Sequence, residues 1–299
     1  TKGVVIATGG YAANLQMVVD TNVYWSSDYL STSTKTTNRS SLKGDGITMA
    51  QAVGADVTGM GYTQMMPISW IDDGNLAFGG GNYAIYINPT TGKRFVDETS
   101  ERDVLSLAEF RNGIEHNGTK GVFIELANAS SKIPGPYLYG NEDVEWRQYV
   151  RTVDQLAELF ASLGLETDAD TVRATIENYD KAVMAGEQPE GVKKTNPNAL
   201  IGYAEKDENG NYLPETYKLD GVEMRVRFMA PSTHHTMGGI KVDTERHALD
   251  AEDNVIPGLY AAGEVTGGIH GGNRLGGNAI VEIFVSGRTA AEAIQADNQ

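Results

Sequence analysis

The chain of 299 residues is long enough for two domains, and its 40% hydrophobic and 21% charged residues are ordinary for a folded protein. Its formal net charge of −16 argues against nucleic acid or an anionic membrane as a partner. The absence of cysteine excludes disulfides, thiolate catalysis and cysteine-ligated metal centres, and the five histidines have no zinc-binding spacing. No run of about 18 apolar residues is present, so we expect no membrane span.

The chain opens with a predicted strand. Residues 2–7 (KGVVIA) form a continuous apolar run, the pattern of a strand buried on both faces. A glycine turn follows, and in a doubly wound sheet ligands bind beyond such strand ends. Residues 11–38 are polar and predict irregular structure. Residues 44–55 predict a helix with Asp45 at its N-cap, a position that capping alone would explain.

The middle of the chain predicts a small α+β lid. Strands are expected at 83–88 and 120–125, with a hairpin continuation at 93–96, and helices at 97–108, 142–151, 156–163 and 168–185. A capping box of Thr152 and Gln155 precedes the third helix. The apolar face of the fourth comprises Val172, Ile176, Tyr179 and Val183. Glu98 and Arg102 have the i,i+4 spacing that by default makes a surface ion pair.

A strand at 222–231 leads into two adjacent histidines, His234 and His235. In an extended chain, neighbouring side chains point to opposite faces, so one histidine could face a substrate and the other a cofactor. Two histidines satisfied by backbone groups in a turn would be the plain alternative.

The last part of the chain is the richest in glycine. Residues 258–264 predict a short buried strand, and a glycine loop carrying a single arginine, Arg274, follows it. An apolar helix is expected from Asn278. Glycines let a backbone approach a flat or anionic ligand, and a helix start offers unpaired N–H groups at the positive end of its dipole. The guanidinium of Arg274 could bind a carboxylate.

Five segments together go beyond a generic glycine loop. GLYAAGEVTGGIHGGNRLGGNAI, VVIATGGYAAN, GDGITMAQAVGA, GKRFVDETSERD and HHTMGGIKVD resemble, in order, the fumarate reductase flavoprotein family, which includes flavocytochrome c fumarate reductases and urocanate reductases. The resemblance implies an α/β fold: a partial FAD-binding doubly wound domain with an inserted α+β capping domain. We expect FAD-binding segments at 1–91 and 236–299 and the capping domain at 92–235. The GxGxxG strand of that family is absent, so we expect a C-terminal portion of a longer flavoprotein.

The resemblance also implies site residues and an activity, the FAD-dependent reduction of the C=C bond of an unsaturated carboxylate. Arg102 would donate the proton, and His234 and Arg274 would hold the substrate carboxylate. The implied cofactor-binding residues are Ala7, Asp45, His235, Glu264, Gly277, Asn278, Ala279 and Ile280. Electrons would come from a haem or FMN domain outside this chain. An FAD-dependent dehydrogenase or oxidase, or a catalytically inactive fragment, would be the alternatives.

One part of the predicted pocket departs from the family. Fumarate-reducing members have a histidine, a Thr-Glu pair and an arginine that bind the second substrate carboxylate and relay a proton. Here the corresponding positions read Met66, Leu76 with Ala77, and Gly80. A buried carboxylate without partners is costly, so a pocket lined by Met66, Ala77 and Gly277 predicts a monocarboxylate enoate with an apolar tail. A plain core position would also explain Met66.

Overall fold

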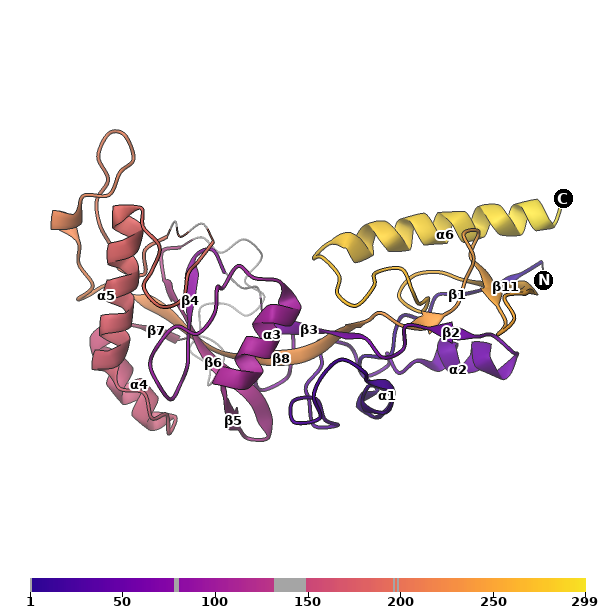
Figure 1. Ribbon diagram of the computed structural model, residues 1–299, viewed down its shortest axis with the longest axis horizontal. Coiled ribbons are helices and arrows are strands. Elements are labelled where there is room, and N and C mark those ends of the chain that lie inside the picture. The colour runs from indigo at the N-terminus through magenta and orange to yellow at the C-terminus, as the bar shows by residue number, and fades with distance from the viewer. Residues whose placement is uncertain (1, 78–80, 132–148, 196, 198) are drawn as a thin grey trace. The chain divides into compact units, whose positions relative to one another are not determined.

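A computed structural model describes residues 2–77, 81–131, 149–195, 197 and 199–299 (Figure 1). The chain divides into two compact units, Thr1–Met66 with Ser232–Gln299, and Pro67–Pro231. The expected division at 1–91, 92–235 and 236–299 stays a prediction about functional domains. The helices of the first unit are α1 (Leu15–Thr21), α2 (Asp45–Ala52) and α6 (Asn278–Asp297). Those of the second are α3 (Arg102–Asn112), α4 (Leu156–Ser162) and α5 (Ala169–Ala185), with short 3-10 helices η1 (Val153–Gln155) and η2 (Pro214–Thr216).

The first unit contains two small sheets. In one, β1 (Val4–Ile6) pairs in parallel with β11 (Val255–Ala261), which pairs antiparallel with β10 (His247–Leu249). In the other, β2 (Val57–Thr58) pairs antiparallel with β9 (Gly239–Ile240). The inner face of α6 packs small side chains, Ala290 and Ala293, against Tyr260 of β11.

The second unit is built on a six-stranded sheet. The strands are β3 (Thr63–Trp70), β8 (Met224–Thr236), β6 (Thr119–Asn128) and β4 (Ala84–Ile87) in that order, with β5 (Ile114–His116) on β6 and β7 (Tyr149–Arg151) on β8. The unit boundaries fall within β3 and β8. The pairs β4–β6 and β6–β8 are antiparallel.

Both faces of this sheet are covered, because alternate strand residues point to opposite sides. One face carries Ile85, Ile124 and Phe228, which share a core with residues of α4 and α5. The other carries Tyr86, Phe123 and Met229, which share a core with Leu105 of α3. The unit therefore has three layers, with α3 on one face and α4 and α5 on the other. The four residues predicted as the buried face of α5 are all buried.

Several predicted elements are confirmed. The helix of the glycine-rich segment begins at Asn278, and the capping box of Thr152 and Gln155 forms. The strand expected at 222–231 is β8, which continues past its expected end through both adjacent histidines to Thr236. The strand expected at 120–125 is β6.

Other expectations are wrong. Residues 11–38, expected to be irregular, contain α1, whose N-cap Asn14 accepts a hydrogen bond from the Met17 N–H. Tyr149–Arg151, expected in a helix, is the strand β7 because it pairs with β8, and the rest of 142–151 lies outside the described residues. The hairpin continuation expected at 93–96 forms in part, as the antiparallel bridge between Ile87 and Arg94 and the hydrogen bond from the Asn88 N–H to the Lys93 carbonyl at 3.0 Å.

The first strand is also less buried than its composition predicts. Val4 and Val5 are 53% and 41% exposed. Within the described part of the chain, β1 is an edge strand that pairs only with β11, so sequence hydrophobicity overestimated its burial.

Candidate active site

The parallel pair β1–β11 brings two functional segments together. Ile6 pairs with Ala261, and the Ala262 N–H donates to the Ile6 carbonyl at 3.0 Å. Both strands therefore end at one edge, where Ala7 continues one segment and Glu264 follows the other. Ala7 is exposed there. Ligands of doubly wound sheets bind at such carboxyl ends.

Glu264 is held in place at this edge by β8. Its Oε1 accepts hydrogen bonds from the Thr236 N–H at 2.9 Å and the Thr236 hydroxyl at 3.3 Å, and its Oε2 lies 3.3 Å from Nδ1 of His235. Burial raises the pKa of Glu264, and the hydrogen bonds from Thr236 oppose that shift. A side chain at Gly10 would collide with this carboxylate, since an added Cβ would lie 2.4 Å from Oε1. Glu264 and His235 thus form one oriented pair.

His234 is oriented by a segment that the sequence predicted only as irregular. The Thr37 hydroxyl lies 2.7 Å from Nδ1 of His234, and the Asn38 amide donates to the His234 carbonyl at 2.7 Å. Thr37 also donates its N–H to the Thr233 carbonyl at 2.9 Å. Thr37 and Asn38 were missed because the signal is a tertiary bridge between segments almost 200 residues apart. A hydroxyl on Nδ1 fixes the orientation of the imidazole ring.

Arg274 is buried within the glycine loop, with 6% of its surface exposed. Gln64 of β3 donates to the Arg274 carbonyl at 2.6 Å, and the Arg274 guanidinium donates to the Leu275 carbonyl at 3.1 Å. Its Nε has no hydrogen-bond partner among the described residues. Burial lowers the pKa of Arg274, and the negative charge of Glu264 opposes the effect. A buried guanidinium with an unpartnered Nε is suited to bind an anion.

The start of α6 is open. Its N-cap, Gly277, has φ = 88° and no side-chain cap, and Gly277, Asn278 and Ile280 are exposed, with Ala279 half-buried. A helix of 20 residues that begins without a side-chain cap presents the positive end of its dipole, while the N–H groups of Asn278 and Ile280 donate to the Leu275 and Gly277 carbonyls at 3.3 and 2.9 Å.

Two further polar residues lie near this region and were not singled out from the sequence. Glu282, in the second turn of α6, is 9% exposed, and its Oε1 has no partner among the described residues. Burial lowers the pKa of His270, with Glu282 opposing that shift, and the His270 ring lies 5.5 Å from that of His235. No local pattern marks either residue, because their proximity depends on how the loop folds back.

The remaining predicted residues are placed as follows. Asp45 is exposed at the first position of α2, and the N-cap is Gly44, so the predicted capping role of Asp45 is wrong. Met66 is buried in β3 of the first unit, and Ala77 is buried in the second unit. Gly80 lies outside the described residues.

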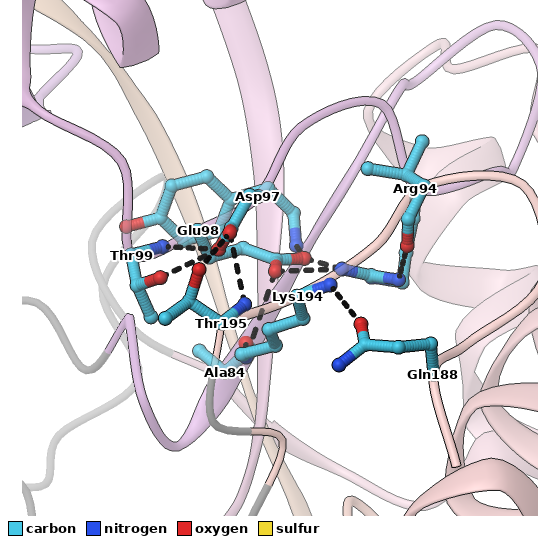
Figure 2. A network of polar contacts seen from close by, with 10 residues as sticks. Ala84, Arg94, Asp97, Glu98, Thr99, Gln188, Lys194 and Thr195 are labelled. Carbon is cyan, nitrogen blue, oxygen red and sulfur yellow. Dashed lines mark hydrogen bonds and ion pairs between the residues drawn. The ribbon is translucent and has the colours of Figure 1, made fainter.

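Arg102 is the first residue of α3 in the second unit and is partly buried. The i,i+4 surface pair expected with Glu98 does not describe this site. Glu98 precedes the helix, is buried, and forms a fork with Arg94 instead. Figure 2 shows Glu98 among the cations that surround it.

The residues of the first unit fit a flavin cofactor on physical grounds. An uncapped helix start suits the anionic edge of a reduced isoalloxazine or a phosphate. A buried carboxylate at the strand ends suits ribityl or ribose hydroxyls, and glycine-rich backbone permits close approach of a flat ring. These features come from separate segments, β1, β8, β11 and α6, that the first unit assembles.

The comparisons with known proteins agree with this fit. A family model described as "FAD binding domain" matches residues 1–280, so the chain belongs to this family of FAD-binding flavoproteins. Its relatives include the NADH:acrylate oxidoreductase of Vibrio harveyi, 38% identical over 97% of this chain and 26% of the relative. The cytochrome-type fumarate reductase of Shewanella frigidimarina is 33% identical over 97% of this chain and 44% of the relative.

The fold agrees as well. The solved open conformation of a flavocytochrome c3 fumarate reductase superposes with a TM-score of 0.67 and 27% identity, covering 99% of this chain and 46% of that one. The chain therefore spans less than half the length of these relatives. In the described part of the chain, no helix is long and apolar enough to cross a membrane.

Proposed function

We propose that the protein carrying this chain reduces the C=C bond of an α,β-unsaturated monocarboxylate, with FAD supplying the hydride when bound. The observation that carries the proposal is Arg274, a buried guanidinium with an unpartnered Nε in the unit that holds the FAD-binding elements. Such a group favours a carboxylate ligand, because two aligned charge-assisted hydrogen bonds offset the cost of its burial.

In this proposal, separate residues bind the substrate and donate the proton. Arg274 and His234 bind the substrate carboxylate, and the positive charge of Arg274 polarises the double bond as charge develops on the adjacent carbon. Arg102 delivers the proton to that carbon. An arginine can do so, despite its very high pKa, where it faces a strongly basic carbanion and regains its proton locally.

The cofactor is bound by the first unit in the same proposal. The peptide groups of residues 277–280 stabilise negative charge on the reduced ring. Glu264 binds cofactor hydroxyls, and His235 orients that carboxylate from a distance of 3.3 Å. Ala7 and Asp45, both exposed, contribute at the ends of β1 and the start of α2.

The side chains of Met66 and Ala77 decide in this proposal which acid is reduced. Met66 and Ala77 would leave a second carboxylate without partners, at a cost of several kcal/mol. We therefore propose that fumarate is a poor substrate and that acrylate-like or cinnamate-like acids are preferred. The relative named as an acrylate oxidoreductase supports a monocarboxylate.

The electron donor is proposed to be a haem or FMN domain, or a separate protein that carries one. One relative is named a cytochrome-type fumarate reductase, which supports a haem donor, and another is named an NADH:acrylate oxidoreductase.

Anaerobic oxidation of a reduced viologen dye by the whole, FAD-loaded protein tests the function. We expect kcat/KM for acrylate or cinnamate to exceed that for fumarate by roughly 100-fold or more, which corresponds to the several kcal/mol of an unpartnered carboxylate. Faster reduction of fumarate would reject the substrate assignment. Absence of dye oxidation with every enoate, together with dye reduction by saturated substrates, would favour a dehydrogenase.

A further inference from the structure

The second unit contains a fully buried carboxylate held by two cations. Arg94 forms a bidentate ion pair with Glu98, in which Nε donates to Oε1 at 2.9 Å and NH2 donates to Oε2 at 2.8 Å. Lys194 Nζ lies 3.5 Å from Oε2 (Figure 2). The Tyr86 N–H also donates to Oε1 at 3.0 Å. The side chains of Glu98 and Lys194 are 0% exposed. Arg94, Glu98 and Lys194 are called the Glu98 clamp below.

Lys194 lies in a loop that the Glu98 clamp binds to the sheet. This loop, residues 187–195, follows α5 and is called the strap. Lys194 Nζ donates to the Ala84 carbonyl at 2.5 Å, and the Arg94 guanidinium donates to the Val192 carbonyl at 2.7 Å. The Gln188 side chain accepts the Lys194 N–H at 3.0 Å within the strap. The strap is therefore bound to both β4 and the segment after it.

The same contacts fix the turn that leads into α3. Thr195 of the strap donates its N–H and hydroxyl to Asp97 Oδ2 at 2.9 and 2.8 Å, while Thr99 donates to Asp97 Oδ1 at 3.0 and 2.6 Å. The Ser100 N–H donates to the Asp97 carbonyl at 3.0 Å. Glu98 lies inside this turn, and Arg102 follows as the first helical residue. The clamp thus holds the chain four residues before Arg102.

Packing alone does not explain why charged groups occupy this place. Burial lowers the pKa of Lys194, with Glu98 opposing the shift, which marks the cost of taking the ammonium group out of water. Apolar side chains of similar volume usually stabilise a core as well or better. A fork and an ammonium group add directional contacts that fix the turn geometry.

From this geometry we infer that Lys194, acting through Glu98, is a positioning residue for Arg102. The inference rests on the proposed role of Arg102 as proton donor. The strap and the turn lie in one unit, so the orientation of the α3 start is set within that unit. Proton transfer is sensitive to displacement, because a shift of about 1 Å can cost on the order of a hundredfold in rate.

Lys194→Met tests the inference in the whole, FAD-loaded protein, since methionine fills similar volume without the charge. We expect kcat for enoate reduction to fall roughly 10- to 100-fold with KM nearly unchanged. The rate of flavin reduction by the viologen dye should stay at the wild-type value, because that step needs no proton from Arg102. Lys193→Met is the matched control, since Lys193 is exposed and adjacent, and it should leave all three quantities unchanged.

The outcomes separate the inference from the proposed function. If Arg102→Gln abolishes turnover while Lys194→Met keeps wild-type kcat, the positioning role is rejected and the proton donor stands. If Arg102→Gln retains turnover, the proposed function is rejected, whatever the result for Lys194→Met. If Lys194→Met lowers kcat, raises KM and slows flavin reduction together, the variant is destabilised in general and the positioning role is rejected.

A milder variant keeps the test decisive if Lys194→Met does not fold. Thr195→Val removes one hydrogen bond to Asp97 at an exposed position. It should lower kcat about two- to tenfold, the equivalent of one hydrogen bond, with KM unchanged. An unchanged kcat in that variant would overturn the inference.

Discussion

Two buried ionisable residues, one in each unit, show that burial has different consequences for an arginine and for a carboxyl group. Arg274 in the first unit keeps an unpartnered Nε, and Glu109 in the second unit has no hydrogen-bond partner for either carboxylate oxygen among the described residues. Arginine keeps its charge in almost any setting, whereas a carboxyl group in the same situation becomes neutral. The first therefore fits anion binding, whereas burial disfavours the charged form of the second.

Arg274→Lys should lower kcat/KM for the enoate roughly 10- to 100-fold, because the ammonium group lacks the fork and loses one charge-assisted hydrogen bond, worth about 1.5–3 kcal/mol. Steady-state kinetics with the viologen dye measure the change. Arg288→Lys, at an arginine whose side chain is 80% exposed on α6, is the control and should have no effect. Equal kinetics for the two variants would remove Arg274 from the substrate site.

Glu109→Gln should make stability less dependent on pH. Burial, and next the negative charge of Glu125, raise the pKa of Glu109 well above its usual range. The folded state therefore binds its proton more tightly than the unfolded state, so this stability is complete below pH about 4.3 and is lost as pH rises through the folded pKa. Between pH 5 and pH 9, urea denaturation should show that the free energy of unfolding falls by about 1–3 kcal/mol more in the wild type than in the variant. Parallel pH profiles would contradict this.

At the scale of elements, the end of α6 is tied to the β10–β11 hairpin by a charged cluster. His247 of β10 bonds through Nδ1 to Asp243 at 2.8 Å and through Nε2 to Asp297 at 2.9 Å. Asp297, the last residue of α6, also accepts a hydrogen bond from the Tyr260 hydroxyl. Glu245 lies 4.0 Å from Nδ1. A carboxylate beside each ring nitrogen favours the protonated imidazole, in which both nitrogens donate.

This cluster predicts a second pH effect on stability. Burial by itself lowers the pKa of His247, but its hydrogen bonds to Asp297 and Asp243 outweigh that and raise it. The stabilisation is fully present below pH about 6.5 and is lost as pH rises through the higher folded pKa, at most about 1 kcal/mol because Asp297 is partly exposed. NMR titration should show that Asp297→Asn lowers the pKa of His247. An unchanged titration would exclude the contact.

At the scale of the whole chain, FAD should stabilise the folded state because its binding elements exist only when β1, β8, β11 and α6 come together. FAD at about 100 times its dissociation constant would add about 2.7 kcal/mol to the free energy of unfolding. Thermal melts with and without FAD measure the shift. Glu264→Gln should reduce it and the exposed Glu252→Gln should not. If FAD shifts the thermal melt of both variants equally, Glu264 does not bind the cofactor hydroxyls.

Much of the architecture follows from local pattern. The capping box at Thr152, the four-residue buried face of α5 and the start of α6 at Asn278 are each confirmed, because they depend on contacts within a few residues. Predictions failed where tertiary partners override composition. Tyr149–Arg151 is a strand because β8 pairs with it, and Val4 and Val5 are exposed because β1 lies at an edge among the described strands.

The sequence by itself determined the chemical inventory: an acidic, cysteine-free chain, a glycine-rich loop with one arginine before a helix, two adjacent histidines that follow a strand, and the family to which these segments belong. Only the tertiary structure decided the partners. Thr37 reaches His234, Gln64 reaches the Arg274 backbone, and Lys194 reaches Glu98 across separations of 96 to 210 residues. Such pairings depend on the packing of distant segments, for which no local spacing in the sequence carries a signal.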